Sequence, residues 1–143
     1  DIAMAIRNQL ARAGVQVKVE VREAGSFRAE LTALKRDFFL TSWGNASMDA
    51  VDFLNPTVRS AGRGNYTGYA NPKVDAILEQ AMAEQDHQER LRLYLECARI
   101  VHDDAPWVFL FTTQEIYAAR RRLGNWAPRR DGWLTMHRAT LDF

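Results

Sequence analysis

Cysteine and histidine are scarce in this chain: it contains a single cysteine, Cys97, and three histidines among 143 residues. One thiol cannot form an intrachain disulfide, so Cys97 is expected to be a small helix residue that says nothing about the redox compartment. His87, His102 and His137 lack the short spacing of a ligand set, so neither a metal site nor another cofactor is predicted. A chain of this length can bury a core without disulfides or metals.

Long hydrophobic runs and an excess of one charge are also missing. The longest apolar stretches, around 38–40 and 107–111, are far shorter than the roughly 20 residues that span a bilayer. The net charge is +1, whereas nucleic-acid binding needs a concentrated basic face, so no nucleic-acid partner is predicted despite the arginines at 120–122. No catalytic Ser, His and Asp set stands out, and Asp103 and Asp104 are interpreted as a helix terminator, so an enzyme is not predicted.

Hydrophobic periodicity predicts helices in four parts of the chain. One covers 2–13, and the others begin at Ser26, at Asn71 with Pro72 in the first turn, and at Asp86, whose capping box is completed by Glu89. The positions expected to face a core are Ile2, Ile6, Leu10, Phe27, Leu31, Leu34, Val74, Ile77, Leu78, Ala81, Met82, Leu91, Tyr94, Leu95, Ala98 and Val101.

Strands are predicted between these helices. Valines alternate with polar residues over 15–21, and β-branched or aromatic residues fill 38–42 and 107–111, with the last strand continuing toward Tyr117. A helix between the first two strands favours parallel pairing, so the expected fold class is α/β, with a mixed sheet flanked by helices. Trp43 and Gly44 then lie at the carboxyl end of a strand, where open α/β sheets bind ligands.

The stretch 45–69 has no sustained period and is expected to be a long irregular loop, a kind of segment that often carries function. Trp43 offers an apolar face and an N–H donor, and Gly44 lets a ligand approach the backbone. Asn45 and Asn65 can offer amides to a polar ligand, although loop asparagines also bond their own backbone. The alternative for Trp43 is a place in the core.

Five short motifs occur in order along the chain. They are LARAGVQV at 10–17, FFLTSWG at 38–44, DFLNP at 52–56, NYTGYANPKVD at 65–75 and DAPWV at 104–108. Together they resemble the C-terminal part of the peptide-type extracellular solute-binding proteins of ABC transporters, which include dipeptide-, oligopeptide- and nickel-binding members. The stretch after Trp43 is most similar to the glutathione-binding subgroup.

The resemblance implies a periplasmic-binding fold of type II, whose two lobes close on a solute and deliver it to a membrane permease. Residues 1–116 would then form most of the second, C-terminal lobe, and 117–143 would return to pack on a first lobe that is absent or lies upstream of Asp1. A full-length member is expected to be monomeric, and either free in the periplasm or anchored outside the cell by a lipid.

One position departs from the family pattern. In peptide-binding members an aspartate near the Trp-Gly motif holds the α-amino group of the ligand, because a buried ammonium needs a paired carboxylate. Ala46 stands at that position, so a free ligand amino group is not expected to be required, and Asp49 is either its substitute or a loop acid. The predicted ligand-binding residues are Trp43, Gly44, Asn45, Ala46, Asp49 and Asn65.

The ligand that the resemblance implies is a small peptide or a peptide-like solute. Within the family, the alternatives are a glycoside, an opine or a chelated metal. Outside it, the alternatives are a small α/β enzyme and a nucleic-acid-binding domain, and neither accounts for the Trp43 motif and the Asn65 motif together.

Overall fold

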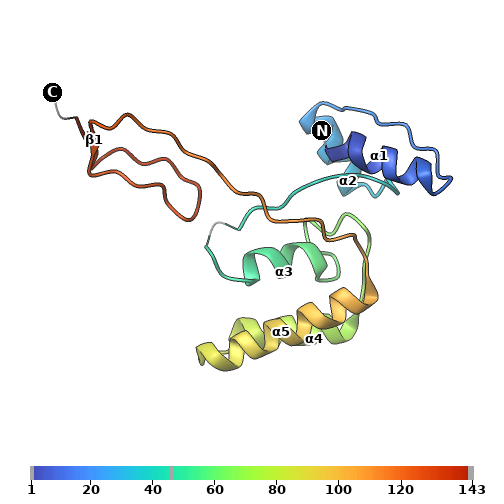
Figure 1. Ribbon diagram of the computed structural model, residues 1–143. Coiled ribbons are helices and arrows are strands. Elements are labelled where there is room, and N and C mark those ends of the chain that lie inside the picture. Colours follow the sequence, from blue (N-terminus) through green and yellow to red (C-terminus); the bar gives the residue numbers. More distant parts are fainter. Residues whose placement is uncertain (1, 46, 142–143) are drawn as a thin grey trace.

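The computed structural model describes residues 2–45 and 47–141, whose regular secondary structure is mainly helical (Figure 1). The helix α4 packs along α5, and α3 packs on α4. The strands β1 and β2 pair antiparallel, with Leu123 opposite Leu141. In chain order the elements are α1 (Ile2–Arg12), α2 (Ala24–Thr32), α3 (Val51–Val58), α4 (Pro72–Ala83), α5 (His87–Asp104), β1 (Leu123–Gly124) and β2 (Thr140–Leu141).

The hydrophobic core lies between α3, α4 and α5. Leu78 and Val74 of α4 are completely buried, as are Val58 of α3 and Cys97 of α5. Burying each such aliphatic side chain stabilises the fold by roughly 1.5–3 kcal/mol. Among the described residues, Leu31 in α2 is the one fully buried hydrophobic side chain outside this cluster. The cluster consists of Leu54, Val58, Val74, Ile77, Leu78, Ala81, Leu93, Tyr94, Cys97 and Val101.

The start of α4 and the end of α5 lie where the sequence predicted them. Asn71 is extended, its side chain accepts a hydrogen bond from the backbone N–H of Lys73, and Pro72 occupies the first helical position, where its missing N–H costs nothing. The helix α5 ends at Asp104, and Ala105 follows with a left-handed backbone at φ 45°. Both helix boundaries were predicted from local residue types.

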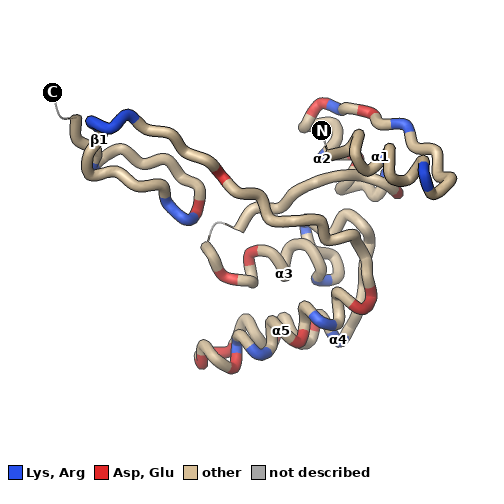
Figure 2. The backbone as a smooth tube through the Cα atoms, in the orientation of Figure 1, with Lys and Arg blue, Asp and Glu red and all other residues tan. Residues whose placement is uncertain are grey.

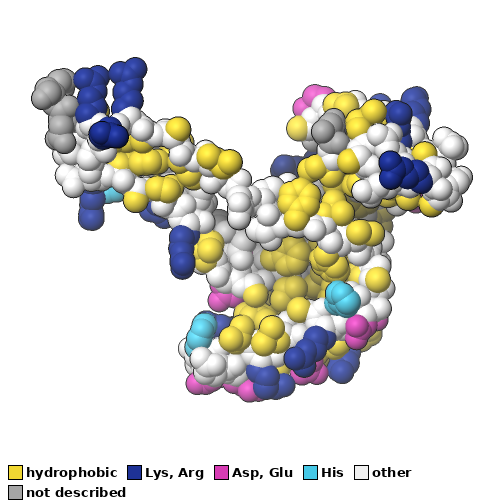
Figure 3. Space-filling view, viewed as in Figure 1, with side chains coloured by type: hydrophobic (Ala, Val, Ile, Leu, Met, Phe, Trp, Pro, Cys, Tyr) yellow, Lys and Arg dark blue, Asp and Glu magenta, His cyan; other side chains and the backbone are white. Residues whose placement is uncertain are grey.

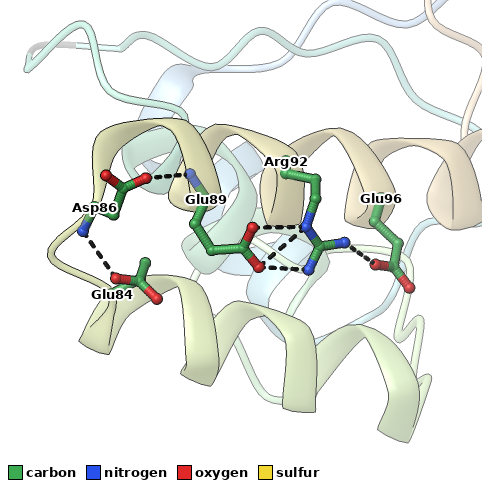
Figure 4. Close-up of polar contacts among 5 residues, drawn as sticks. All are labelled: Glu84, Asp86, Glu89, Arg92 and Glu96. Carbon is green, nitrogen blue, oxygen red and sulfur yellow. Dashed lines mark hydrogen bonds and ion pairs between the residues drawn. The ribbon is translucent and has the colours of Figure 1, made fainter.

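The predicted capping residue of α5 is confirmed (Figure 4). A carboxylate oxygen of Asp86 accepts a hydrogen bond from the backbone N–H of Glu89 at 2.8 Å, which satisfies one free donor of the first turn. Arg92 then pairs with Glu89 and with Glu96 along the exposed face of the helix. Exposed pairs at this spacing contribute little to stability, because water and salt screen them.

The helix α2 begins earlier than predicted. Glu23, rather than Ser26, caps it, because the Glu23 carboxylate accepts the backbone N–H groups of Gly25 and Ser26 at 2.8 Å and 2.9 Å. These bonds hold the pKa of Glu23 below its ordinary value. Leu34 lies beyond the helix at φ 51° and is 54 % exposed, so its predicted place on the buried face was wrong.

The face of α5 that packs against the core differs in part from the face that the sequence predicted to be buried. Tyr94 and Val101 are buried as expected, but Leu91 and Leu95 are 44 % and 52 % exposed. Leu93 and Cys97 take their place against α4. Two apolar stripes of helical period occur on this helix, and only packing selects one of them. Two further predicted core positions, Met82 in α4 and Ala98 in α5, are also exposed.

The expected irregular loop at 45–69 contains the helix α3. Leu54 and Val58, one helical turn apart, are buried against the other core helices. An eight-residue helix is too short to give a clear hydrophobic period, and Pro56 inside it argues against a helix. Tertiary burial therefore decides that this segment is helical.

The predicted strands at 15–21, 38–42 and 107–117 form no ladder in the described parts of the chain, so the mixed sheet expected from the sequence is not observed there. A strand needs a neighbouring backbone for its hydrogen bonds, and these segments do not pair with one another. Their apolar side chains are largely exposed: Val21 is 93 % and Val108 82 % exposed. Hydrophobic side chains consequently gather on the face shown in Figure 3.

Candidate functional site

Trp43 is held in place by the backbone of α3 and of the loop after it. Its indole N–H donates a hydrogen bond of 2.9 Å to the backbone oxygen of Asp52. Gly64 packs directly on the six-membered ring, since a Cβ atom there would lie 2.3 Å from Cζ3 of Trp43. The glycine is therefore required for this close approach, and the half-buried indole joins the segment before α3 to the loop after it.

Arg63 covers one face of the Trp43 ring. Its guanidinium carbon lies 4.8 Å from the ring centroid, within the range of a cation–π interaction. The pKa of Asp52 is held below its ordinary value, chiefly by hydrogen bonds from Ser47 and secondarily by the charge of Arg63. A ligand approaching Trp43 from this side meets a cation stacked on the indole.

Gly44 and Asn45 follow Trp43 at the surface. A Cβ atom on Gly44 would meet nothing within 4 Å, so the backbone here is open to solvent. The amide nitrogen of Asn45 donates to the backbone oxygen of Asp49 at 2.9 Å, whereas its Oδ1 atom is buried and has no hydrogen-bond partner in the described parts of the protein. An N–H or O–H donor of a ligand, or a water, would remove the cost of this unpaired oxygen.

Asp49 links the same loop to helix α5 of the core. One carboxylate oxygen accepts the backbone N–H of Val51 at 3.0 Å, and the other lies 3.7 Å from the guanidinium of Arg90 in α5. The pKa of Tyr94, also in α5, is raised first by burial and then by the charge of Asp49. The carboxylate of Asp49 thus already has a cationic partner.

Asn65 bonds its own loop. Its side-chain oxygen accepts the backbone N–H of Tyr69 at 3.1 Å, and its amide nitrogen donates to the backbone oxygens of Arg59 and Tyr69 at 3.0 Å and 2.7 Å. These bonds match the alternative that the sequence left open for loop asparagines. Asn65 therefore fixes the backbone of the loop after α3, which also contains Gly64.

Asp104 has a role beyond terminating a helix. Its Oδ2 accepts hydrogen bonds from the phenol of Tyr69 and, at 2.7 Å, from the amide of Asn71, which caps α4. These bonds lower the pKa of Asp104 from its ordinary value, while burial and the bond to Asp104 raise the pKa of Tyr69 to about 12. The end of α5 is tied in this way to the start of α4, and no local pattern in the sequence predicts the link.

A hollow of about 450 Å³ opens beside the Trp43 loop and was not predicted. Ser47 and Met48 line it from the loop, and Arg129, Arg130 and Asp131 line it from the C-terminal segment. Met48 has a left-handed backbone, with φ 62°, and its side chain is mostly exposed. Left-handed φ values of this kind are uncommon in non-glycine residues and often mark functional loops.

Two findings concern membranes and metals. Within residues 2–45 and 47–141, no helix has the length and apolarity needed to cross a bilayer. In the same part of the chain, no group of three or more His, Cys, Asp and Glu side chains comes together as ligands for a metal ion.

Comparison with known proteins gives a consistent set of relatives. The glutathione-binding protein GsiB of Pectobacterium atrosepticum is 31% identical over 128 residues, which is 82% of this chain. The probable D,D-dipeptide-binding periplasmic protein DdpA of Escherichia coli is 32% identical over 113 residues, 77% of this chain. No protein-family model matches.

A solved structure shares both sequence and fold with the chain. It is the ABC transporter-associated periplasmic binding protein DppA from Helicobacter pylori in complex with the peptide STSA, which is 29% identical and matches 74% of this chain with a TM-score of 0.66. The chain is a homologue of periplasmic peptide-binding proteins. This confirms the family resemblance that the motifs predicted.

The chain is much shorter than these relatives. It spans 24% of GsiB, 22% of DdpA and 22% of the DppA chain. All three relatives are named as binding proteins, and DppA is described as associated with an ABC transporter. They are also described as periplasmic in two of the three cases, DdpA and DppA.

The structure brings some of the predicted site residues together. Trp43, Gly44, Asn45 and Asp49 lie in one loop before α3, joined by the hydrogen bonds given above. Asn65 lies behind that loop with its amide committed to backbone groups. The predicted position Ala46 falls outside the described residues. Ligand binding by these residues stays a prediction.

Proposed function

We propose that the chain is part of the substrate-binding component of an ABC importer that captures a small peptide or a peptide-like solute. The observation that carries this proposal is the joint likeness in sequence and fold to DppA of Helicobacter pylori, a structure that contains a peptide. In this mechanism two lobes close on the solute, remove it from water and deliver it to permease subunits in the membrane. No covalent chemistry is needed.

The exposed extended segments support a two-lobed whole. Residues 1–116 would form the second lobe, with 15–21, 38–42 and 107–116 as strands that pair with backbone outside this chain. Ile116 is 94 % exposed and Phe38 65 % exposed, and exposed hydrophobic residues of this size on unpaired backbone favour a missing partner. Residues 117–143 would cross back to the first lobe. The complete protein would act as a monomer in the periplasm, either free or lipid-anchored.

The loop before α3 is the proposed ligand wall. Trp43 would contribute an apolar surface, Gly44 an open backbone, and Asn45 the unpaired Oδ1 atom as an acceptor for a ligand N–H. The carboxylate of Asp49 pairs with Arg90, so it is not free to hold a ligand ammonium. We therefore infer that the solute is not recognised through a free α-amino group.

The test uses the longest polypeptide that the gene encodes, purified from its native host. Native mass spectrometry is expected to detect co-purified small peptides or peptide-like solutes, and calorimetry with the same compounds should give saturable binding. N-acetylation of a bound peptide should leave its affinity within about twofold, because no carboxylate is assigned to its amine. A protein that retains a sugar or a metal chelate, and binds no peptide, would contradict the proposal.

The isolated chain 1–143 provides the matched comparison. It contributes only part of the cleft wall, so its affinity for the same peptides should be much weaker than that of the complete polypeptide. Equal affinity of the two proteins would show that binding does not need closure of two lobes.

A further inference from the structure

The loop that leads into α3 is tied to α5 by a charge pair. The carboxylate of Asp49 lies 3.7 Å from the guanidinium of Arg90, and the two side chains are only 34 % and 30 % exposed. Figure 2 shows the acidic residues of this loop and the basic residues in the first part of α5. Arg90 also donates a hydrogen bond of 3.3 Å to the backbone oxygen of Glu84, just after α4. Arg90 therefore joins the loop to two core helices.

The buried phenol of Tyr94 lies beside this charge pair, about one helical turn after Arg90. The pKa of Tyr94 is raised first by burial and then by the charge of Asp49, whereas the charge of Arg90 lowers it, so the phenol is close to both. The pair thus stands against the buried face of α5. Arg92, by contrast, makes its ion pairs on the exposed face of the same helix, where its side chain is 56 % exposed.

The position of Asp49 decides how the Asn45 side chain is oriented. The backbone oxygen of Asp49 accepts hydrogen bonds from Nδ2 of Asn45 at 2.9 Å and from the backbone N–H of Asp52 at 3.1 Å. Because a carbonyl oxygen only accepts hydrogen bonds, the nitrogen end of the carboxamide must face it. The Oδ1 atom of Asn45 is then the end left over, buried and without a partner in the described residues. Whatever fixes Asp49 therefore fixes this oxygen.

The other polar side chains of this loop already have partners within it. The Asp52 carboxylate accepts the backbone N–H of Ser47 at 2.8 Å and also bonds the Ser47 hydroxyl. The same hydroxyl oxygen accepts the backbone N–H of Asp49 at 3.2 Å, and the Trp43 N–H is taken by the backbone oxygen of Asp52. In the described part of the loop, Asn45 Oδ1 is thus the buried side-chain acceptor that remains for a ligand.

The charges around this oxygen favour a neutral donor over an ammonium group. The Asp49 carboxylate already has its cation, and Arg63 places a further guanidinium over the Trp43 ring. An ammonium group brought to Asn45 would be desolvated without a free carboxylate, which is costly, whereas a neutral N–H needs only the neutral oxygen. Gly44 leaves the adjacent backbone open to an approaching solute. The loop therefore suits a main-chain amide N–H.

We propose that Arg90 is a positioning residue which, through Asp49, holds the Asn45 carboxamide so that its oxygen accepts an amide N–H of the solute. This inference rests on the proposed function and narrows its solute class to peptides or peptide-like compounds that present a neutral amide N–H at this loop. Arg90 acts from α5 and does not touch the solute. Its effect passes through the Asp49 side chain to the Asp49 backbone oxygen and from there to Asn45.

The experiment compares amides with esters in the complete polypeptide. Synthetic di- to tetrapeptides, including STSA, are prepared with analogues in which one peptide N–H at a time is replaced by an ester oxygen, and affinities are measured by calorimetry. At one position of the solute, we expect the ester to bind about fivefold to tenfold more weakly, because a hydrogen bond is lost and Asn45 Oδ1 stays unpaired. In Asn45→Ala, amide and ester should bind within about twofold of each other.

Arg90→Gln should also reduce this preference for the amide to less than about twofold, while the affinity for the ester changes little. Asp49→Asn breaks the same pair from the loop side and should have the same effect, so a failure of one variant to fold leaves the other as the test. Arg90→Lys keeps the cation and should retain most of the preference. Arg92→Gln is the matched control, because Arg92 pairs only along the exposed face of α5, and it should leave the preference unchanged.

The outcomes separate this inference from the proposed function. If no peptide binds the unaltered protein, the proposed function and this inference are both wrong. If peptides bind but no ester replacement weakens binding, or if Asn45→Ala keeps the preference, the acceptor role of Asn45 is overturned. If Arg90→Gln behaves like Arg92→Gln, or weakens amide and ester equally as a purely structural residue would, the positioning role of Arg90 is overturned and the proposed function stands.

Discussion

The three core helices and the extended segments around them differ sharply in how they bury apolar side chains. In α3, α4 and α5, residues such as Leu78 and Val74 are completely shielded from solvent. In the extended segments, Val21, Val108 and Ile116 are more than 80 % exposed, at 93 %, 82 % and 94 %. Both kinds of segment are rich in apolar residues, so composition alone does not explain the difference.

The reason lies in where each kind of backbone finds its hydrogen bonds. A helix satisfies its own N–H and C=O groups, so α3, α4 and α5 need only face each other to form a core. An extended segment satisfies its backbone only beside another strand, and the relatives that this chain matches are about four times longer. The helical part can therefore form locally, whereas the predicted strands find no pairing partner within residues 2–45 and 47–141.

The largest effect should come from removing a core leucine. Leu78→Ala is expected to lower the free energy of unfolding of the helical part by about 2–5 kcal/mol, because the residue is fully buried between core helices. Leu134→Ala is the matched change in the C-terminal segment, where Leu134 is 61 % exposed, and should cost less than about 0.5 kcal/mol. Urea unfolding followed by far-ultraviolet circular dichroism measures both, and equal losses would contradict the contrast between the two regions.

A smaller effect is expected where the Trp43 loop meets the core helices. Gly64→Ala should destabilise the protein by about 1–3 kcal/mol and alter tryptophan fluorescence, because the new methyl group would overlap the Trp43 ring. Gly44→Ala, whose Cβ has open space, should change stability by less than about 0.5 kcal/mol. If both variants kept the fluorescence of the parent protein, the packing of Trp43 against Gly64 would not hold in solution.

The smallest effect concerns the link between α4 and α5 through Asp104. The pKa of Asp104 is lowered in the folded protein from 3.8, so its contribution to stability is fully present above pH 3.8 and is lost as the pH falls through the folded value. Asp104→Asn should remove this part of the acid dependence in thermal unfolding measured from pH 6 down to pH 2. Asp103→Asn, at an 82 % exposed neighbour, is the control, and an identical pH profile for both variants would rule out the link.

Local residue types predicted most of the helices. Asn71 with Pro72 and Asp86 with Glu89 marked two helix starts because capping depends on residues within one turn. The face that α5 buries was predicted only in part, since Leu91 and Leu95 form a stripe as regular as that of Leu93 and Cys97. Choosing between such stripes requires the position of α4.

The site could be predicted less completely than the helices. Trp43, Gly44 and Asn45 were identified as one loop, and the structure keeps them together beside α3. The pairing of Asp49 with Arg90 was not foreseen, nor was the position of Arg130 beside Ser47. These contacts join residues that are distant in the sequence, and no short pattern records them.

The sequence by itself determined the family resemblance and most helix boundaries, because each depends on motifs or on neighbours within a few positions. Only the tertiary structure decided that 51–58 is helical, which face of α5 is buried, and that Asn65 bonds its own loop. It also decided that 15–21, 38–42 and 107–117 form no strand ladder within the described residues, and that Arg130 lies beside the Trp43 loop. The physical reason is that burial and strand pairing depend on which distant segments meet in space.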